Sequence, residues 1–247
     1  SEAVFREGYL KLGTVPFQDF WSMVRVAPQL IRLRSHRSVY DVVSDYMKDP
    51  HLRQAFSFQS LLIGGNPFQV SSIYALIHAL ERQWGVQFPR GGTGALVRSL
   101  VRLFHDLGGE VRLGCPVQEI RVRNGRATEV ATTDGRSVVV DAVASNADVV
   151  HTYTRLLAGT DRGQAMARRL TRKSFSNSLF VVYFGLKRQY PEIAHHTVLF
   201  GPRYRELLTD IFDRGILPDD FSLYLHNPSR TDPSLAPPGQ AGFWRSC

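Results

Sequence analysis

The first third of the chain carries apolar residues at helical spacing. Phe17, Phe20, Trp21 and Val24 fall three and four residues apart, so they share one face of a helix, which Ala27 or Pro28 continues. Proline and paired glycines interrupt the pattern, because proline disfavours helix in the residue before it and glycine often ends a helix. Four helices are therefore predicted here, over residues 17–33, 38–47, 52–62 and 71–85.

The pattern changes between residues 88 and 150. A glycine-rich turn at 90–94 precedes a helix whose apolar side chains are expected to face inward: Leu96, Val97, Leu100, Val101 and Phe104. Short strands follow, and the dipeptides Asn124-Gly125 and Asp134-Gly135 are typical of tight hairpin turns. The strands are predicted over residues 110–113, 117–123, 127–132, 137–140 and 141–148.

Beyond residue 150 the chain mixes helix and strand. Stretches rich in valine, phenylalanine and tyrosine predict strands over 178–186, 197–200 and 222–226. The fold class is therefore α+β. The three textures divide the chain into predicted segments 1–88, 89–150 and 151–247.

Composition narrows the class without naming a reaction. Hydrophobic residues make up 43% of the chain and charged residues 21%, an ordinary balance for a globular protein. The net charge is +8, but basic residues such as Arg25, Arg32, Arg34 and Arg37 stand singly between apolar ones. This arrangement favours scattered basic helix faces, and no nucleic-acid partner is expected.

Cysteine usage and hydropathy favour a cytoplasmic protein. Cys115 and Cys247 form neither a metal-binding spacing nor a disulfide framework, which is typical of a reducing compartment. No run approaches the ~18–20 apolar residues needed to span a bilayer. No signal peptide opens the chain, and its first residue is Ser1 rather than Met, which is compatible with processing or with a start inside a gene.

The turn at Gly91-Gly92-Thr93-Gly94 has two interpretations. A helix N-terminus with exposed N–H groups can hold a phosphate. However, the spacing fits neither a dinucleotide fingerprint, because position 97 is a valine, nor a P-loop, which ends in Gly-Lys-Ser/Thr. A plain turn with Thr93 capping the helix is the favoured interpretation.

Other candidate chemistry is weak. Adjacent residues on a strand point in opposite directions, so His195 and His196 are expected to be ordinary loop histidines, and no metal site is predicted. No Gly-x-Ser-x-Gly elbow occurs, and no catalytic residue can be assigned. The helix over 17–33 interleaves aromatic residues with arginines, so it either lies in a membrane interface or faces the core with a solvated basic side.

Several segments, in the same order along the chain, resemble bacterial phytoene desaturases. Each motif is weak alone, and their collinear order from Phe5 to about Pro237 makes the resemblance specific. The motifs are FREGYLKLG (5–13), HLRQAFSF (51–58), GGNPF (64–68), PRGGTGAL (89–96), AVASNADVVHTY (142–153), SNSLF (176–180), HHTV (195–198) and FGPRYREL (200–207).

The resemblance implies an FAD enzyme of carotenoid biosynthesis that introduces double bonds into phytoene toward lycopene. It implies part of a Rossmann-like FAD/NAD(P)-binding flavoprotein fold, with a helical lid region over 1–88, a middle FAD-domain segment over 89–150 and a mixed-sheet substrate domain over 151–247. In related amine-oxidase-like flavoproteins a valine contacts the adenine through its backbone, and the matching position is Val117; a plain buried strand valine is the alternative. Lipophilic carotenoid partners imply peripheral attachment to a bacterial membrane from the cytoplasm, which favours an interfacial role for residues 17–33.

Departures from the family pattern limit this expectation. No Gly-x-Gly-x-x-Gly occurs, the family's C-terminal glycine-rich segment is absent, and the tail from about residue 238 resembles a truncated or out-of-frame end. The chain alone is therefore expected to be an inactive fragment without tightly held FAD. The alternatives are a carotenoid isomerase or another amine-oxidase-like flavoprotein, and a non-enzymatic membrane-binding module.

Overall fold

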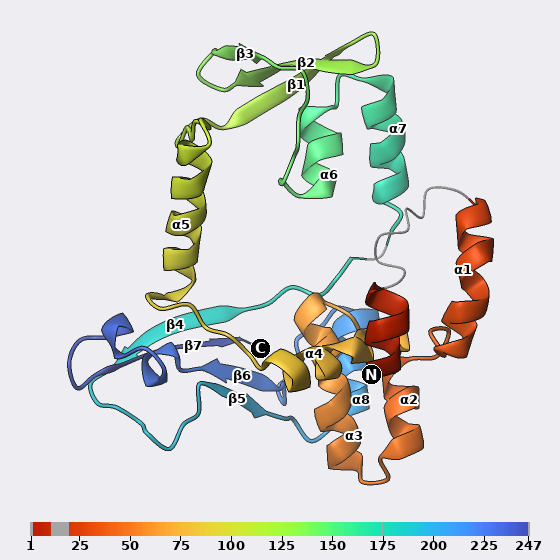
Figure 1. The fold of residues 1–247 in the computed structure, drawn as a ribbon, viewed down its shortest axis with the longest axis vertical. Helices are drawn as coiled ribbons and strands as arrows, with labels where there is room; N and C mark the ends of the chain where they lie inside the picture. The colour runs from red at the N-terminus through yellow and green to blue at the C-terminus, as the bar shows by residue number, and fades with distance from the viewer. Residues whose placement is uncertain (1, 11–19, 174, 247) are drawn as a thin grey trace. The chain divides into compact units, whose positions relative to one another are not determined.

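The computed structural model describes residues 2–10, 20–173 and 175–246, and the chain divides into two compact units (Figure 1). The first unit combines residues 1–97 with residues 176–247, and the second unit comprises residues 98–175. The first unit therefore unites segments that are distant in sequence. The two units are defined by their compactness. The functional boundaries predicted at residues 88 and 150 therefore stay a prediction.

The N-terminal part of the first unit is helical, as predicted. Its α-helices are α1 (Phe20–Arg32), α2 (Val39–Tyr46), α3 (Pro50–Ser57) and α4 (Leu76–Trp84). The Ser38 hydroxyl caps α2 by accepting a hydrogen bond from the Asp41 N–H. Asp49 caps α3, and Pro50 is the first residue of that helix. Residues 58–63 continue from α3 as a 3₁₀-helix that ends at Gly64. The predicted helical residue Phe17 lies outside the described residues.

The C-terminal part of the first unit is an antiparallel sheet beside the helix α8 (Tyr204–Thr209). Its strands are β4 (Val181–Leu186), β5 (His196–Leu199), β6 (Leu223–His226) and β7 (Ala241–Ser246), in the order β4-β7-β6-β5. The strand β7, which was not predicted, comes from the tail beyond residue 238 and occupies an inner position. Phe243 on β7 is buried, as are Leu207 and Leu208 on α8.

The second unit contains a three-stranded meander and short helices. Its strands are β1 (Val117–Arg123), β2 (Arg126–Thr132) and β3 (Ser137–Val139), and the helices α6 (Val149–His151) and α7 (Asp161–Leu170) follow. Asn124 and Gly125 both have positive φ, which is the two-residue hairpin turn that their sequence predicts. The strands predicted over 110–113 and 141–148 do not form.

The helix α5 (Gly92–Asp106) runs from the first unit into the second, and the expectation that its apolar side chains face inward is wrong. Leu96, Val97, Leu100 and Phe104 are each about half exposed. Helical periodicity predicts that these side chains share a face, but it does not supply the element that would cover them.

The predicted α+β class is confirmed. In the parts of the chain that the structure describes, no helix is both long and apolar enough to cross a membrane.

Candidate functional site

The first unit contains an apolar cavity of about 340 Å³ between the sheet and its helices. One face of the sheet supplies Val198, Tyr224 and Trp244 to its lining, because side chains two residues apart on a strand share a face. The segment 58–62 and helix α8 supply the opposite wall. Aromatic and aliphatic side chains predominate, which suits an apolar ligand. Below, this space is called the apolar cavity.

Two of the motifs from the sequence meet beside this cavity. The rings of Phe68 and Tyr204 lie 5.4 Å apart, and the Arg205 guanidinium lies 3.8 Å above the Phe68 ring. The fully buried Ser57 hydroxyl forms a 2.9 Å hydrogen bond with the Tyr204 hydroxyl. The GGNPF and FGPRYREL motifs therefore pack against each other. Tyr204 of the second motif also lines the apolar cavity.

Ionisable groups are scarce in the lining. Among the described residues that line the apolar cavity, Tyr204 and Tyr224 are the titratable ones, and burial raises the pKa of both phenols. A neutral phenol is a poor general base near neutral pH. The cavity can bind and orient an apolar molecule, but its lining offers no carboxylate or imidazole to remove a proton. The catalytic residues thus remain unassigned.

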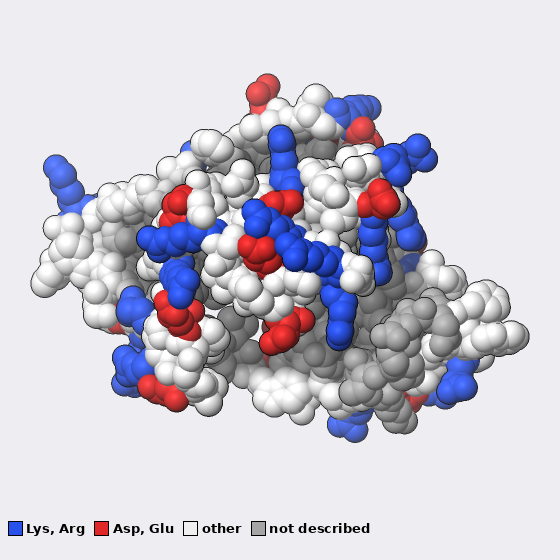
Figure 2. Space-filling model, turned by 90° about the horizontal axis from the view of Figure 1, so that it is seen from above, with Lys and Arg blue, Asp and Glu red and all other residues white. Residues whose placement is uncertain are grey.

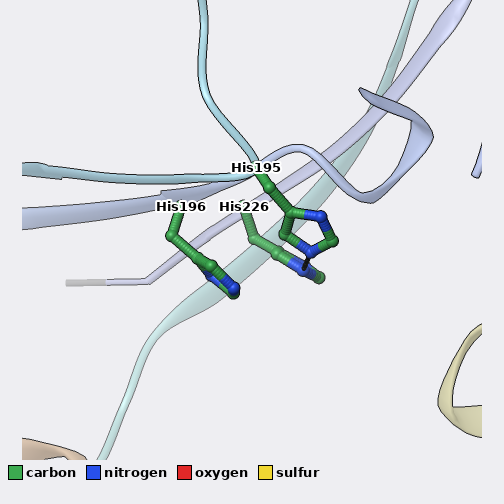
Figure 3. A group of neighbouring side chains, drawn as sticks. All are labelled: His195, His196 and His226. Atoms are coloured by element: carbon green, nitrogen blue, oxygen red, sulfur yellow. Dashed lines mark hydrogen bonds between the residues drawn. The ribbon is translucent and has the colours of Figure 1, made fainter. Parts of the chain in front are cut away.

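Three histidines gather on the same sheet face, at one end of β5 and β6 (Figure 3). His196 pairs with His226 across the two strands, and His195 precedes β5. A nitrogen atom from each ring lies within 4.8 Å of the other two, and the Nε2 atoms of His195 and His226 are 2.7 Å apart. Below, these residues are called the histidine cluster.

The side chains of the adjacent residues His195 and His196 lie close together, contrary to the prediction. The His195 and His196 side chains were expected to diverge, but their ring centroids are 4.4 Å apart. The alternation of a regular strand does not reach His195, because the chain bends there before β5 begins. His226 was missed altogether. The composition of residues 222–226 predicted its strand, but nothing local indicates which strand pairs with it.

Burial lowers the pKa of all three imidazoles. In His226 the pKa falls to about 4, with further lowering from His195 and His196. Burial also lowers the pKa of His196, against the opposing charge of Glu81 on α4. The three rings are therefore neutral at pH 7.

Val117, the predicted adenine contact, lies at the start of β1 in the second unit. The residue is 39% exposed, and its role, as an adenine contact or as a plain strand valine, stays a prediction. The Pro116 carbonyl accepts the Thr133 N–H at 3.0 Å. Because the C=O and N–H of one trans peptide point in opposite directions, the Val117 N–H faces the outer edge of β1.

A second hollow, of about 440 Å³, lies over the sheet face that carries the paired residues Ile120 of β1 and Val130 of β2. Pro116, Val117 and the segment 143–147 contribute to its lining. Within the motif AVASNADVVHTY, residues 143–147, where a strand was predicted, form an irregular part of this lining, and α6 follows at Val149–His151. The hollow is largely apolar and has Val117 in its lining, and the adenine contact of Val117 stays a prediction.

The glycine-rich turn is engaged by a carboxylate of the first unit. The Gly91 N–H donates to Asp232 at 2.6 Å. The helix α5 begins at Gly92, so Thr93 lies within its first turn and does not precede it as a cap. The favoured interpretation of a structural turn agrees with this contact, because a donor that a phosphate would need is occupied.

Comparisons with known proteins agree with the collinear motifs. The family described as flavin containing amine oxidoreductase matches residues 3–242. The chain is 61% identical over 244 residues to a phytoene desaturase (lycopene-forming) of Pseudescherichia vulneris, and 58% identical over 244 residues to one of Pantoea ananas. Each match covers 99% of this chain and 50% of the relative, so the chain spans about half the length of the curated relatives it matches.

More distant matches extend the pattern. A phytoene desaturase (neurosporene-forming) of Rhodobacter capsulatus is 43% identical over 99% of this chain and 47% of its own length. A crystal structure of an oxidoreductase from Methanosarcina mazei matches with a TM-score of 0.63 at 19% identity, covering 92% of this chain and 51% of that one. That likeness shows a shared fold alone.

Proposed function

Because this chain belongs to the flavin-containing amine oxidoreductase family, we propose that it serves in a flavin-dependent desaturase of phytoene. The observation that carries this proposal is the 61% identity, over 99% of the chain, to the phytoene desaturase (lycopene-forming) of Pseudescherichia vulneris. The relatives are about twice as long, so the proposal concerns a reaction to which these residues contribute.

The apolar cavity supports a hydrocarbon substrate. A polyene has no polar group to recognise, so binding depends on apolar contact area and shape. The cavity supplies apolar contact area, and the two family motifs that pack against each other contribute Tyr204 to its wall. We assign these residues the binding and orientation of the hydrocarbon chain.

The cofactor in this proposal is FAD. We assign its adenine end to the hollow that Val117 lines, with the Val117 N–H as a donor to a ring nitrogen. When bound, FAD supplies an acceptor for the hydride that leaves one carbon as the neighbouring carbon loses a proton. Among the described residues, the lining of the apolar cavity has no carboxylate or imidazole, which agrees with a reaction whose redox chemistry is supplied by the cofactor.

Peripheral membrane contact on the cytoplasmic side of a bacterial membrane is also proposed. Phe20 and Trp21 on α1 are 72% and 74% exposed, and their rings lie 5.8 Å apart on the helix surface. Exposed aromatic side chains beside arginines are typical of helices that lie in a membrane interface. On the face drawn in Figure 2, basic side chains are interspersed with acidic ones.

The double substitution Phe20→Ser and Trp21→Ser tests the membrane contact. Burying each aromatic side chain contributes about 1.5–3 kcal/mol, so the variant should bind vesicles of anionic phospholipid at least tenfold more weakly in a flotation assay. Tyr46→Ser on α2 is the matched control, because Tyr46 is equally exposed outside α1. Equal binding by both variants would exclude α1 as the contact.

Desaturation itself is tested in a chimera. Residues 3–237 of this chain replace the matching segment of the Pseudescherichia vulneris relative, and the purified chimera is incubated with FAD and phytoene in vesicles. We expect products with additional conjugated double bonds. A folded chimera that retains flavin and leaves phytoene unchanged would overturn the proposal.

A further inference from the structure

We propose that the histidine cluster is a binding site for a divalent transition-metal ion such as Zn²⁺. His196 and His226 are cross-strand neighbours on β5 and β6, and His195 joins them from the bend before β5. Three imidazole ligands with an open fourth position are a common arrangement for zinc. No metal site is predicted from the sequence, but that expectation rested on diverging side chains, which the structure does not show.

Hydrogen bonds at the ring edges favour ligating tautomers. His195 Nδ1 is hydrogen-bonded to the Thr231 hydroxyl, and His196 Nδ1 to the Tyr224 hydroxyl. When each Nδ1–H donates to the oxygen, the Nε2 atom of that ring keeps its lone pair for a metal. Such outer partners are typical of metal-binding histidines, whose ring orientation they fix.

The third ring has a nitrogen that the protein does not satisfy. His226 is buried, and its Nδ1 has no hydrogen-bond partner among the described residues. Because His226 faces His195 through its Nε2 atom, Nε2 is the nitrogen that an ion shared by the three rings would bind, and Nδ1 is not a ligand. The 2.7 Å contact between the Nε2 atoms of His195 and His226 also requires that one of them carry a proton, which a shared metal ion would replace.

The distances require small side-chain movements on binding. Zinc–nitrogen bonds of ~2.0–2.1 Å place tetrahedral ligand atoms about 3.4 Å apart. The His195–His226 pair must therefore open from 2.7 Å, while more distant pairs, which lie within 4.8 Å, must close. His196 is exposed, so its ring can shift toward the other two rings while it keeps its Tyr224 partner, and Phe88 and Trp244 hold those two rings by edge contacts.

Neighbouring groups favour the cation and define its effect. The Glu81 carboxylate acts electrostatically on His196, so the site lies within reach of a negative charge. Tyr224 and Trp244 line the apolar cavity on the same sheet face. A bound ion would therefore fasten β5 to β6 beside the cavity and stabilise that end of the sheet.

The test uses the 247-residue chain, freed of any affinity tag and dialysed against a chelator. Zn²⁺ is titrated by calorimetry, and Co²⁺ is titrated as a spectroscopic probe. We expect one equivalent to bind, with visible Co²⁺ absorption bands of a low-coordinate nitrogen site. His196→Gln should weaken binding by more than the ~10–100-fold that loss of an outer partner costs. Because His196 is exposed, this variant should fold even if His226→Gln does not.

His51→Gln is the control, because His51 is exposed on α3, outside the cluster. Its affinity for Zn²⁺ should equal that of the unmodified chain, and Zn²⁺ should raise the thermal midpoint of both but not of His196→Gln. Absence of stoichiometric binding would overturn the proposal. Equal binding by all variants would do the same, since it would indicate an adventitious ion only.

Discussion

The interpretations of Val117 and Gly91 each depend on a single backbone N–H group. At Val117 an N–H points outward from an edge strand, and at Gly91 an N–H is already held by Asp232. The resemblance to known flavoproteins indicated Val117 but could not supply its orientation, which depends on the pairing of Pro116 with Thr133. Asp232 could not be predicted as a partner of Gly91, because 141 residues separate them and no local pattern links them.

The Val117 assignment is tested by removing only the N–H. In the chimera, Val117→Pro should retain much less FAD, since proline lacks the donor but is tolerated on an edge strand whose N–H faces outward. Val117→Ala keeps the donor and should retain FAD nearly as well as the unmodified chimera. Flavin absorbance per mole of protein is the measurement. Equal retention by both variants would show that the N–H does not contribute.

The Gly91–Asp232 contact predicts a pH dependence of stability. Hydrogen bonds from Ser234 and from Gly91 lower the pKa of Asp232. The folded state therefore binds a proton less readily than the unfolded state, so the stabilisation is complete above the ordinary pKa of ~3.9 and is lost as pH falls through the lower folded pKa. Asp232→Asn should lower the urea midpoint at pH 6, and the difference should shrink below pH ~4.

Asp219→Asn serves as the control for this measurement, because Asp219 is exposed and no described hydrogen bond involves it. It should unfold like the unmodified chain at every pH. A gap between Asp232→Asn and the unmodified chain that stays constant down to pH 3 would show that the charge of Asp232 is not the cause.

Helices and meander strands were predictable because their signals are local. The helix predicted from residue 38 begins after its cap Ser38, and Asn124-Gly125 forms its hairpin turn, whereas α3 begins at Pro50, two residues before the predicted start at 52. The strand β7 was missed because its residues follow no clear alternation and its partners, β4 and β6, are set by tertiary pairing. Likewise, the apolar cavity has no signature along the chain, since it joins segments from residue 58 to residue 246.

The GGNPF element depends on a left-handed turn at Gly64. Its φ is 72°, and an added Cβ would lie 2.6 Å from the Cβ of Ser176. Gly215 ends another helical segment with φ 66°, but an added Cβ there meets nothing within 4 Å. Gly215→Ala should cost only the conformational term of about 1–2 kcal/mol in the free energy of unfolding.

Gly64→Ala should cost about 1–3 kcal/mol more than Gly215→Ala, because the backbone near Ser176 must also move. Urea denaturation of the two variants measures both terms. Equal losses of stability would mean that the GGNPF turn and the SNSLF segment are not in close contact.

At the scale of the whole molecule, the fold class and the protein family could be predicted from the sequence, but the histidine cluster and the apolar cavity could not. The α+β class and the membership of a flavin family follow from motifs spread over the entire chain. The histidine cluster and the cavity depend on which strands become neighbours. The predicted inactivity of the chain alone, without tightly held FAD, stays a prediction.

The most direct test of the proposed function is turnover of phytoene by the chimera with its cavity altered. Val198 lines the apolar cavity, whereas Leu199 next to it on β5 is exposed and lies outside the lining. Val198→Asp should abolish desaturation while flavin content is retained, because a carboxylate in an apolar cavity excludes a hydrocarbon. Leu199→Asp should leave turnover almost unchanged. Turnover by the Val198→Asp chimera equal to that of the Leu199→Asp chimera would contradict the account.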